Sequence, residues 1–151
     1  MDHRNEQVEA FVQALHTASQ REKKPLVRST HFLLPPGDND PIEHNILSWK
    51  AQEFAYRQFS QDREALPTLA RGLFTEKVHG QYERIVIRGY DKFFNQDELA
   101  WTLPNAIATY STGPFILSFK ENGCIIFISA ITPKRLIVTS KHSLGFRTEG
   151  D

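Results

Sequence analysis

The chain has 151 residues, enough for one domain with its own hydrophobic core; 40% of them are hydrophobic and 24% are charged, which excludes a disordered chain. Its 18 basic and 18 acidic residues cancel, so overall charge gives no argument for nucleic-acid binding, which would require a local basic surface. No apolar run is long enough to span a bilayer.

The first third of the chain predicts a helix and a connector. Apolar residues recur at helical spacing over residues 6–20, which indicates an amphipathic helix. Three prolines and a glycine within residues 33–41 predict a loop or extended connector, the one internal boundary of the chain. Residues 48–59 mix helical and alternating patterns, so periodicity leaves strand and helix open there.

The remainder predicts an antiparallel sheet. Segments rich in Ile, Val and Phe and bounded by turn formers predict strands over residues 70–75, 83–88, 114–120, 124–131 and 135–140. A short helix that stops near Pro104 is expected between the second and third of them. Thr132-Pro133-Lys134 is typical of a hairpin turn. The fold class is therefore α+β, with an N-terminal helix followed by an antiparallel sheet.

Lys120 has the strongest chemical signal in the chain. It stands between two apolar, β-rich runs in FILSFKENGCIIFISAI, residues 115–131, and Gly123 follows it. Burial between strands would lower its pKa from about 10.4 and make the amine a nucleophile at neutral pH. Gly123, without a Cβ, would let the chain turn and a ligand approach the backbone. A second Lys-x-x-Gly, residues 77–80, lies in a polar stretch that favours the loop of a hairpin.

The single cysteine and the histidines predict no metal or disulfide chemistry. Cys124 lies in an apolar run, which predicts a small buried side chain, and a lone cysteine favours a reducing compartment. The N-terminus has no signal-peptide pattern, so nucleus or cytoplasm is the expected location. The six histidines are scattered without metal-ligand spacing, so no metal site is predicted.

Several short motifs occur in a fixed order along the chain. They are SWK at 48–50, ARGLF at 70–74, IRGYDKFFN at 87–95, KENG at 120–123 and VTSKHSLG at 138–145. Together they resemble the adenylyltransferase domain of fungal tRNA ligases and, more distantly, the bacteriophage RNA ligases. The resemblance implies a partial, ligase-type nucleotidyltransferase domain, unrelated to ATP-grasp folds. Residues 46–151 would form its nucleophile half, and residues 1–45 an N-terminal helix and connector.

The resemblance also implies roles for individual residues. Lys120 would attack the α-phosphate of ATP, giving a lysyl-AMP intermediate and pyrophosphate, with Mg²⁺ assisting. ATP-binding roles are implied for Arg71, Lys92, Phe94, Gly123 and Lys141. Cations suit these positions because the triphosphate is anionic and negative charge builds on the leaving pyrophosphate. The implied partners are RNA, as tRNA exon halves, and the C-terminal half of the same ligase.

Each of these residues also has an ordinary structural alternative. Arg71 could be a strand-edge arginine with its stem packed and its head in water, and Lys92 and Lys141 could be solvated surface lysines. Of the adjacent aromatics, one ring is expected to pack inward while Phe94 borders the nucleotide.

The family's later motifs have no counterpart in the 31 residues that follow Lys120. These motifs are an acidic strand position, a Glu-Gly element and a Lys-x-Lys pair. We therefore expect the N-terminal portion of an ATP-dependent tRNA ligase that is incomplete and weakly active or inactive alone. The alternative is a truncated, non-catalytic RNA- or nucleotide-binding module, and a small α+β interaction domain is a third possibility.

Overall fold

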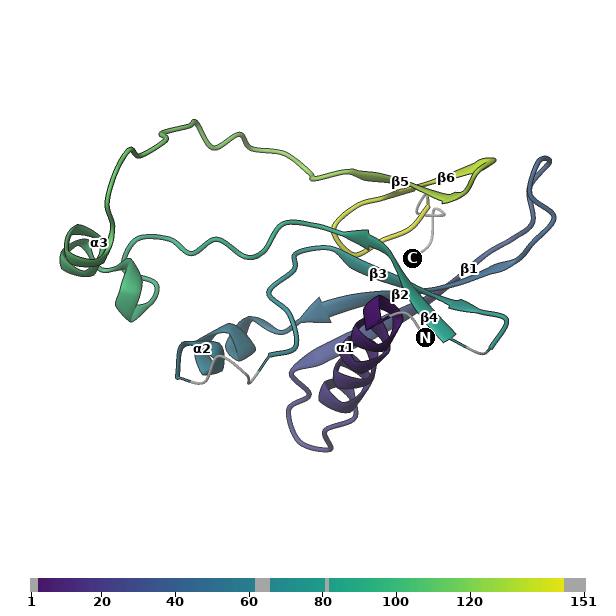
Figure 1. The fold of residues 1–151 in the computed structure, drawn as a ribbon, viewed down its shortest axis with the longest axis horizontal. Helices are drawn as coiled ribbons and strands as arrows, with labels where there is room; N and C mark the ends of the chain where they lie inside the picture. Colours follow the sequence, from purple (N-terminus) through teal and green to yellow (C-terminus); the bar gives the residue numbers. More distant parts are fainter. Residues whose placement is uncertain (1–2, 62–65, 81, 146–151) are drawn as a thin grey trace, which may run out of the picture.

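The computed structural model describes residues 3–61, 66–80 and 82–145. Its helices are α1 (His3–Ser19), α2 (Glu53–Gln61) and α3 (Pro104–Tyr110), with a short 3-10 helix, η1 (Ala100–Thr102). Its strands are β1 (Val27–Leu34), β2 (His44–Ala51), β3 (Leu73–Val78), β4 (Tyr82–Arg88), β5 (Phe127–Thr132) and β6 (Arg135–Thr139). Figure 1 shows the expected α+β fold, an N-terminal helix followed by antiparallel sheets, and confirms it.

The core of the fold is a four-stranded antiparallel sheet in the order β1-β2-β3-β4. Side chains alternate between the two faces of each strand. On β2, Ile46 and Ser48 belong to one face and Leu47 and Trp49 to the other. Three of these four side chains are buried and Leu47 is partly buried, so both faces of this sheet must be covered.

Helix α1 covers one face of the sheet. Leu15 and Trp49 belong to the same buried apolar cluster. His16 adds polar contacts, because its Nε2 lies 2.8 Å from Oε1 of Glu83 on β4 and its ring meets Trp49 edge-on at 4.9 Å between centroids. The Trp49 indole in turn donates a 2.8 Å hydrogen bond to the hydroxyl of Thr75. The helix is therefore held by apolar packing and by a short chain of hydrogen-bonded side chains.

The β5–β6 hairpin covers the opposite face. Ile131 and Ile137 from the hairpin pack with Ile46, Phe74 and Ile87 of the sheet, and all five are buried. Figure 1 shows α1 and this hairpin on opposite sides of the four strands. The hairpin is joined by the turn expected at residues 132–134, with Thr132 opposite Arg135.

The ring of Phe127 on β5 packs against two glycines, Gly72 of ARGLF and Gly89 of IRGYDKFFN. A Cβ at Gly72, where φ is +91°, would lie 2.3 Å from a ring carbon of Phe127. A Cβ at Gly89 would lie 2.1 Å from the Arg71 carbonyl oxygen and 2.7 Å from the same ring. The Gly89 N–H donates a 2.6 Å hydrogen bond to the Gly72 carbonyl. These glycines let the backbones and the ring approach closely, and so position the hairpin.

A buried charged network ties the hairpin to the other end of the sheet. The ring of His44 contacts Glu76 through Nδ1 at 2.5 Å and Asp40 through Nε2 at 2.8 Å. The imidazole therefore bridges two carboxyl groups through its two ring nitrogens. Arg84 completes the network, since it donates to Glu76 and, at 2.6 Å, to the carbonyl of Ile131 on β5.

Several expectations about the elements are confirmed. Strands occur where 83–88 and 135–140 predict them, and residues 77–80 lead into the turn between β3 and β4. Residues 48–59 contain the end of β2 and most of α2, which accounts for their mixed pattern. Residues 33–41 contain the end of β1 and part of the connection to β2, its partner in the same sheet.

Pro104 begins a helix rather than ending one. It is the first residue of α3, where its missing N–H costs nothing and its fixed φ suits the helix. The expected short helix that stops near this proline is present as η1, which ends at Thr102, whereas α3 was not predicted.

The strand expected over residues 114–120 does not form. Residues 111–126 run as an exposed, extended segment from α3 to β5 (Figure 1), and Ile116 and Phe119 are 94% and 97% exposed. A strand needs a neighbour to take its backbone hydrogen bonds, and none lies beside this segment in the part of the chain that the structure describes. Consequently Cys124 is exposed rather than buried, and β5 begins at Phe127.

Gly89→Ala should destabilise the fold by about 1–3 kcal/mol or more, because the new methyl group would overlap a backbone carbonyl and the Phe127 ring. Urea unfolding followed by circular dichroism measures the change. Gly123→Ala is the matched control, since no atom lies within 4 Å of its added Cβ. Equal effects of the two substitutions would contradict the proposed docking of Phe127.

Asp40→Asn should destabilise the fold in a pH-dependent way. The hydrogen bond from His44 holds the pKa of Asp40 below its ordinary value of 3.8. The ionised carboxylate therefore stabilises the fold above the unfolded-state pKa, and this contribution is lost as the pH falls through the lower folded-state pKa. In urea titrations, the deficit of Asp40→Asn should shrink as the pH is lowered from about 5 towards about 2.5. The exposed neighbour Asp38, replaced by Asn, should show no such trend.

Candidate functional site

The register of the sheet brings several cationic residues to one end of the molecule. Trp49 of β2 lies opposite Leu73 of β3, and Leu73 lies opposite Arg88 of β4. The end of β2, the start of β3 and the end of β4 are therefore neighbours. Lys50 follows Trp49 on β2, and Arg71 stands just before β3.

The segments that carry Arg71 and Lys92 are joined through their backbones. The Arg71 N–H donates to the carbonyl of Tyr90 at 2.8 Å, and the Lys92 N–H donates to the carbonyl of Leu69 at 2.7 Å. Ala70 and Asp91 form an isolated β-bridge between these contacts. The motifs ARGLF and IRGYDKFFN are thus paired strand against strand, and each contributes one cation to the same place.

Lys141 reaches this place from β6. The Ser48 hydroxyl on β2 donates a 3.0 Å hydrogen bond to the backbone carbonyl of His142, which fixes the segment after β6 against the sheet. Burial, and then the charge of Arg71, lowers the pKa of Lys141; Lys50 and Lys92 act in the same direction and Glu53 opposes them. Four cations from separate segments are therefore within electrostatic reach of one another.

We call Lys50, Arg71, Lys92 and Lys141 the cationic cluster. Arg71 lies half-buried with its guanidinium 4.0 Å from the carboxylate of Glu53. A group of like charges that is partly withdrawn from water is unfavourable unless anions offset it. The cluster is consequently suited to bind a compact anion such as a phosphate group.

Lys92 is buried, so the solvated-lysine alternative is wrong for this residue. Its side chain is 7% exposed, and its Nζ lies 2.7 Å from a carboxylate oxygen of Glu98. The ammonium also lies 4.6 Å from the ring centroid of Phe94 and 5.5 Å from that of Tyr56. The hydrogen bond from Lys92 lowers the pKa of Glu98, and burial raises the pKa of Tyr56.

One of the two adjacent phenylalanines packs inward, as expected, and that ring is Phe94. It packs against the α1-side core, where it meets Tyr56 and Trp101 edge-on. Phe93 is 67% exposed. Phe94 nevertheless borders the cationic cluster, because Lys92 lies over its face.

An acidic, aromatic cavity lies beside the cluster. Its volume is about 520 Å³, and its lining comes mainly from α2 and residues 94–99. Glu53, Tyr56, Phe94 and Glu98 are among the lining residues. Two of these carboxylates are the neighbours of Arg71 and Lys92, so the cavity ends at the cluster.

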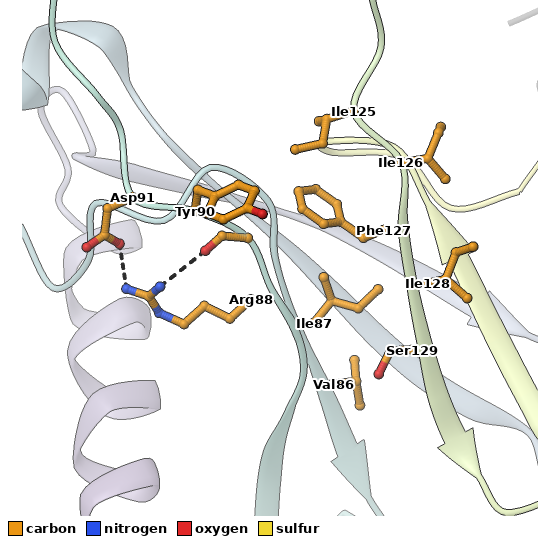
Figure 2. Close-up of a pocket in the computed structure, with 11 residues that line it drawn as sticks. Val86, Ile87, Arg88, Tyr90, Asp91, Ile125, Ile126, Phe127, Ile128 and Ser129 are labelled. Carbon is orange, nitrogen blue, oxygen red and sulfur yellow. Dashed lines mark hydrogen bonds and ion pairs between the residues drawn. The ribbon is translucent and has the colours of Figure 1, made fainter. Parts of the chain in front are cut away.

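A larger cavity of 710 Å³ opens between β4 and the start of β5 (Figure 2). Apolar residues line most of it, including Val86, Ile87 and Ile126. Its charged residues are Arg88 and Asp91, which pair with each other at 2.5 Å. None of the residues predicted for catalysis or ATP binding lines this cavity.

Lys120 lies outside the cationic cluster, in the exposed segment before β5. Its Nζ contacts Oδ1 of Asn122 at 3.4 Å, and its charge is not among those that act on Lys141. Gly123, in the same segment, has no atom within 4 Å of an added Cβ. The expected burial of Lys120 between strands is wrong, and the β5–β6 hairpin does not bring Lys141 back to it. Arg71, Lys92, Phe94 and Lys141 are brought together.

Sequence reasoning missed three members of this neighbourhood. Lys50 stands in the SWK motif, which contributes to the family resemblance but gives no separate indication of a role for this lysine. Tyr56 gave no signal because the pattern of its segment is ambiguous. His142 stands beside Lys141, and burial first, and Lys141 next, lowers the pKa of its imidazole from 6.5 to about 4. Its Nδ1 is buried without a hydrogen-bond partner among the described residues.

The described part of the chain holds neither a cluster of metal ligands nor a helix suited to cross a membrane. Within residues 3–61, 66–80 and 82–145, no group of three or more His, Cys, Asp or Glu side chains is arranged to hold a metal ion. Over the same part of the chain, no helix has the length and apolar character needed to cross a membrane.

Comparison with known proteins identifies relatives over most of the chain. A family model described as RNA ligase matches residues 69–151. The chain is 46% identical over 136 residues to tRNA ligase 1 of Schizosaccharomyces pombe, a match that covers 82% of this chain and 17% of that protein. It is 44% identical over 102 residues to tRNA ligase of Candida albicans, covering 68% and 11% respectively. The chain thus spans less than one fifth of either relative.

The imidazole of His142 should titrate near pH 4, and Lys141→Met should raise this pKa while leaving it below 6.5. Removal of the lysine charge eliminates one repulsion, whereas burial, the larger cause, remains. A pH titration of the imidazole carbon-bound protons by NMR measures both values. Lys77→Met, which removes an exposed lysine elsewhere on β3, is the control and should change nothing. No change in Lys141→Met would contradict the arrangement of the cluster.

Proposed function

This chain belongs to the RNA ligase family, and on that premise we propose that it is an N-terminal portion of an ATP-dependent tRNA ligase that joins tRNA exon halves. The relatives that carry the name tRNA ligase support the substrate class. The observation that carries the proposal is the cationic cluster. Four separate segments of the chain bring one cation each to the same end of the sheet, where a polyphosphate would be bound.

The cluster is suited to the phosphates of ATP. Arg71 can donate two parallel hydrogen bonds to phosphate oxygens, and Lys50 and Lys141 can supply mobile ammonium groups. Lys92 is held in place by Glu98 and by the Phe94 ring, so its charge is fixed before a ligand arrives. Fixed charges stabilise developing negative charge without reorganising. Mg²⁺ would accompany the phosphates, through which this ion is usually bound.

The proposed nucleophile is Lys120. Its Nζ, after losing a proton, would attack the α-phosphorus of ATP. A nitrogen–phosphorus bond forms, the bond to the bridging oxygen breaks, and pyrophosphate leaves with the electron pair. An oxygen of an RNA 5′-phosphate would then attack the same phosphorus and restore the lysine. Finally, an RNA 3′-hydroxyl would attack the activated 5′-phosphorus and release AMP.

The exposed position of Lys120 limits what this portion would do alone. Attack requires the nitrogen to lie about 3–3.5 Å from phosphorus in a defined direction. The exposed segment would therefore have to approach the cationic cluster before reaction. We expect weak nucleotide binding and little or no sealing by the isolated 151-residue chain.

The same position of Lys120 favours a second candidate, a module that binds RNA or nucleotide without chemistry. In that case Arg71, Lys92 and Lys141 would retain phosphate contact while Lys120 forms no adduct. The two candidates differ in one covalent bond, so they can be separated directly.

Incubation of the chain with ATP and Mg²⁺ should produce a low level of an acid-labile AMP adduct, detected by intact mass spectrometry. Lys120→Ala should abolish the adduct, because it removes the attacking nitrogen. Lys141→Ala should reduce it about tenfold or more, equivalent to about 1.4 kcal/mol of lost phosphate stabilisation.

Lys77→Ala is the matched control, since Lys77 lies in the other Lys-x-x-Gly and should leave the adduct unchanged. If only Lys77→Ala lost the adduct, the nucleophile would be Lys77 rather than Lys120. RNA binding without any adduct would favour the module, and binding of neither RNA nor ATP would contradict both candidates.

A further inference from the structure

Two exposed cations face each other across the first two strands. Arg28 of β1 and Lys50 of β2 are directly opposed in the antiparallel register, so their side chains project from the same face of the sheet. Both are exposed. Neither forms an ion pair with any of the residues that the structure describes. Like charges directly opposite one another destabilise a sheet, so this pair needs a reason other than folding.

This pair extends the cationic cluster to the edge of the sheet. Lys50 acts on the pKa values of Lys141 and His142, and so belongs to the cluster, whereas Arg28 lies one strand further out. β1 is the edge strand in the order β1-β2-β3-β4 (Figure 1). The next opposed pair on the same face is Thr30 and Ser48, of which Thr30 has an exposed hydroxyl.

The carboxylates beside the cationic cluster, Glu53 and Glu98, lie against Arg71 and Lys92 rather than against Arg28 and Lys50. The buried carboxylates of Asp40 and Glu76 lie at the opposite end of the sheet, where they contact His44 and Arg84. Positive side chains form a row from the cluster across β2 to β1, with a step of about 4.8 Å between strands.

We propose that Arg28 and Lys50 bind the phosphodiester backbone of the RNA substrate and direct its end to the cationic cluster. This inference rests on the proposed function, which requires an RNA phosphate to reach the cluster. A row of cations matches a repeating polyanion, whereas a nucleotide has one compact group of phosphates. Arginine, lysine and threonine side chains are common donors to nucleic-acid phosphates, which position the strand without reading its sequence.

Fluorescence anisotropy with a 3′-labelled, 5′-phosphorylated single-stranded RNA tests the proposal in the absence of ATP. The double variant Arg28→Ala/Lys50→Ala should bind RNA at least tenfold more weakly than the wild type. The slope of log affinity against log salt should fall by about 1.4, because each lost phosphate contact on single-stranded RNA contributes about 0.7. Arg28→Lys/Lys50→Arg should retain binding.

The matched control is Lys77→Ala/Lys134→Ala. It removes the same number of charges from exposed positions on β3 and in the β5–β6 turn. It should leave the RNA affinity and the salt slope nearly unchanged. Thermal unfolding of Arg28→Ala/Lys50→Ala distinguishes a role in RNA binding from a role in folding. Because the two like charges oppose each other, their removal should maintain or raise Tm. A fall in Tm together with the loss of binding would count against the proposal.

The outcomes separate this inference from the proposed function. Equal loss of RNA binding in both double variants would overturn the inference. Equally tight, equally variant-sensitive binding of a polyaspartate peptide would overturn the assignment to RNA. Wild-type chain that forms the AMP adduct but does not bind RNA would overturn the inference and leave the proposed adenylylation standing. If the wild-type chain forms no adduct but binds RNA, and Arg28→Ala/Lys50→Ala loses that binding, the inference is supported and the chain acts as a binding module.

Discussion

The antiparallel register of β2, β3 and β4 is the constraint on which the candidate site depends. It places the end of β2, the start of β3 and the end of β4 side by side, so that residues far apart in sequence become neighbours. Backbone hydrogen bonds between the segments of Arg71 and Lys92 then extend this pairing beyond the strands. A slip of one residue would turn Lys50 to the opposite face of the sheet and remove it from the cluster.

Lys141 is positioned by a different mechanism, the docking of the β5–β6 hairpin. Phe127 packs on Gly72 and Gly89 near the cationic end, while Arg84 binds the Ile131 carbonyl near the other end. The hairpin is therefore held at both ends of its length, and β6 delivers Lys141 to the sheet. This gives the motif glycines a structural task beside any part they have in ligand binding.

The sequence predicts those parts of the fold that local patterns determine. Residues 83–88 and 135–140 are short apolar runs flanked by turn formers, and each becomes a strand. Pro104 shows the limit of a local signal, because a proline can end one helix or begin another and only the neighbouring structure decides. Burial of Lys92 could not be predicted, since its aromatic neighbour Tyr56 comes from a distant helix.

The candidate site residues fall into two groups, those held by contacts with the sheet and those in the exposed segment before β5. Arg71, Lys92 and Lys141 belong to segments that pair with one another or dock on the sheet, so these cations are brought together without a ligand. Lys120 belongs to a segment whose apolar side chains remain in water, although burial of each would contribute about 1.5–3 kcal/mol. The described residues do not bury these side chains. Under the proposed function, cations that are already grouped and a proposed nucleophile that lies apart from them would make phosphate binding and covalent chemistry separable.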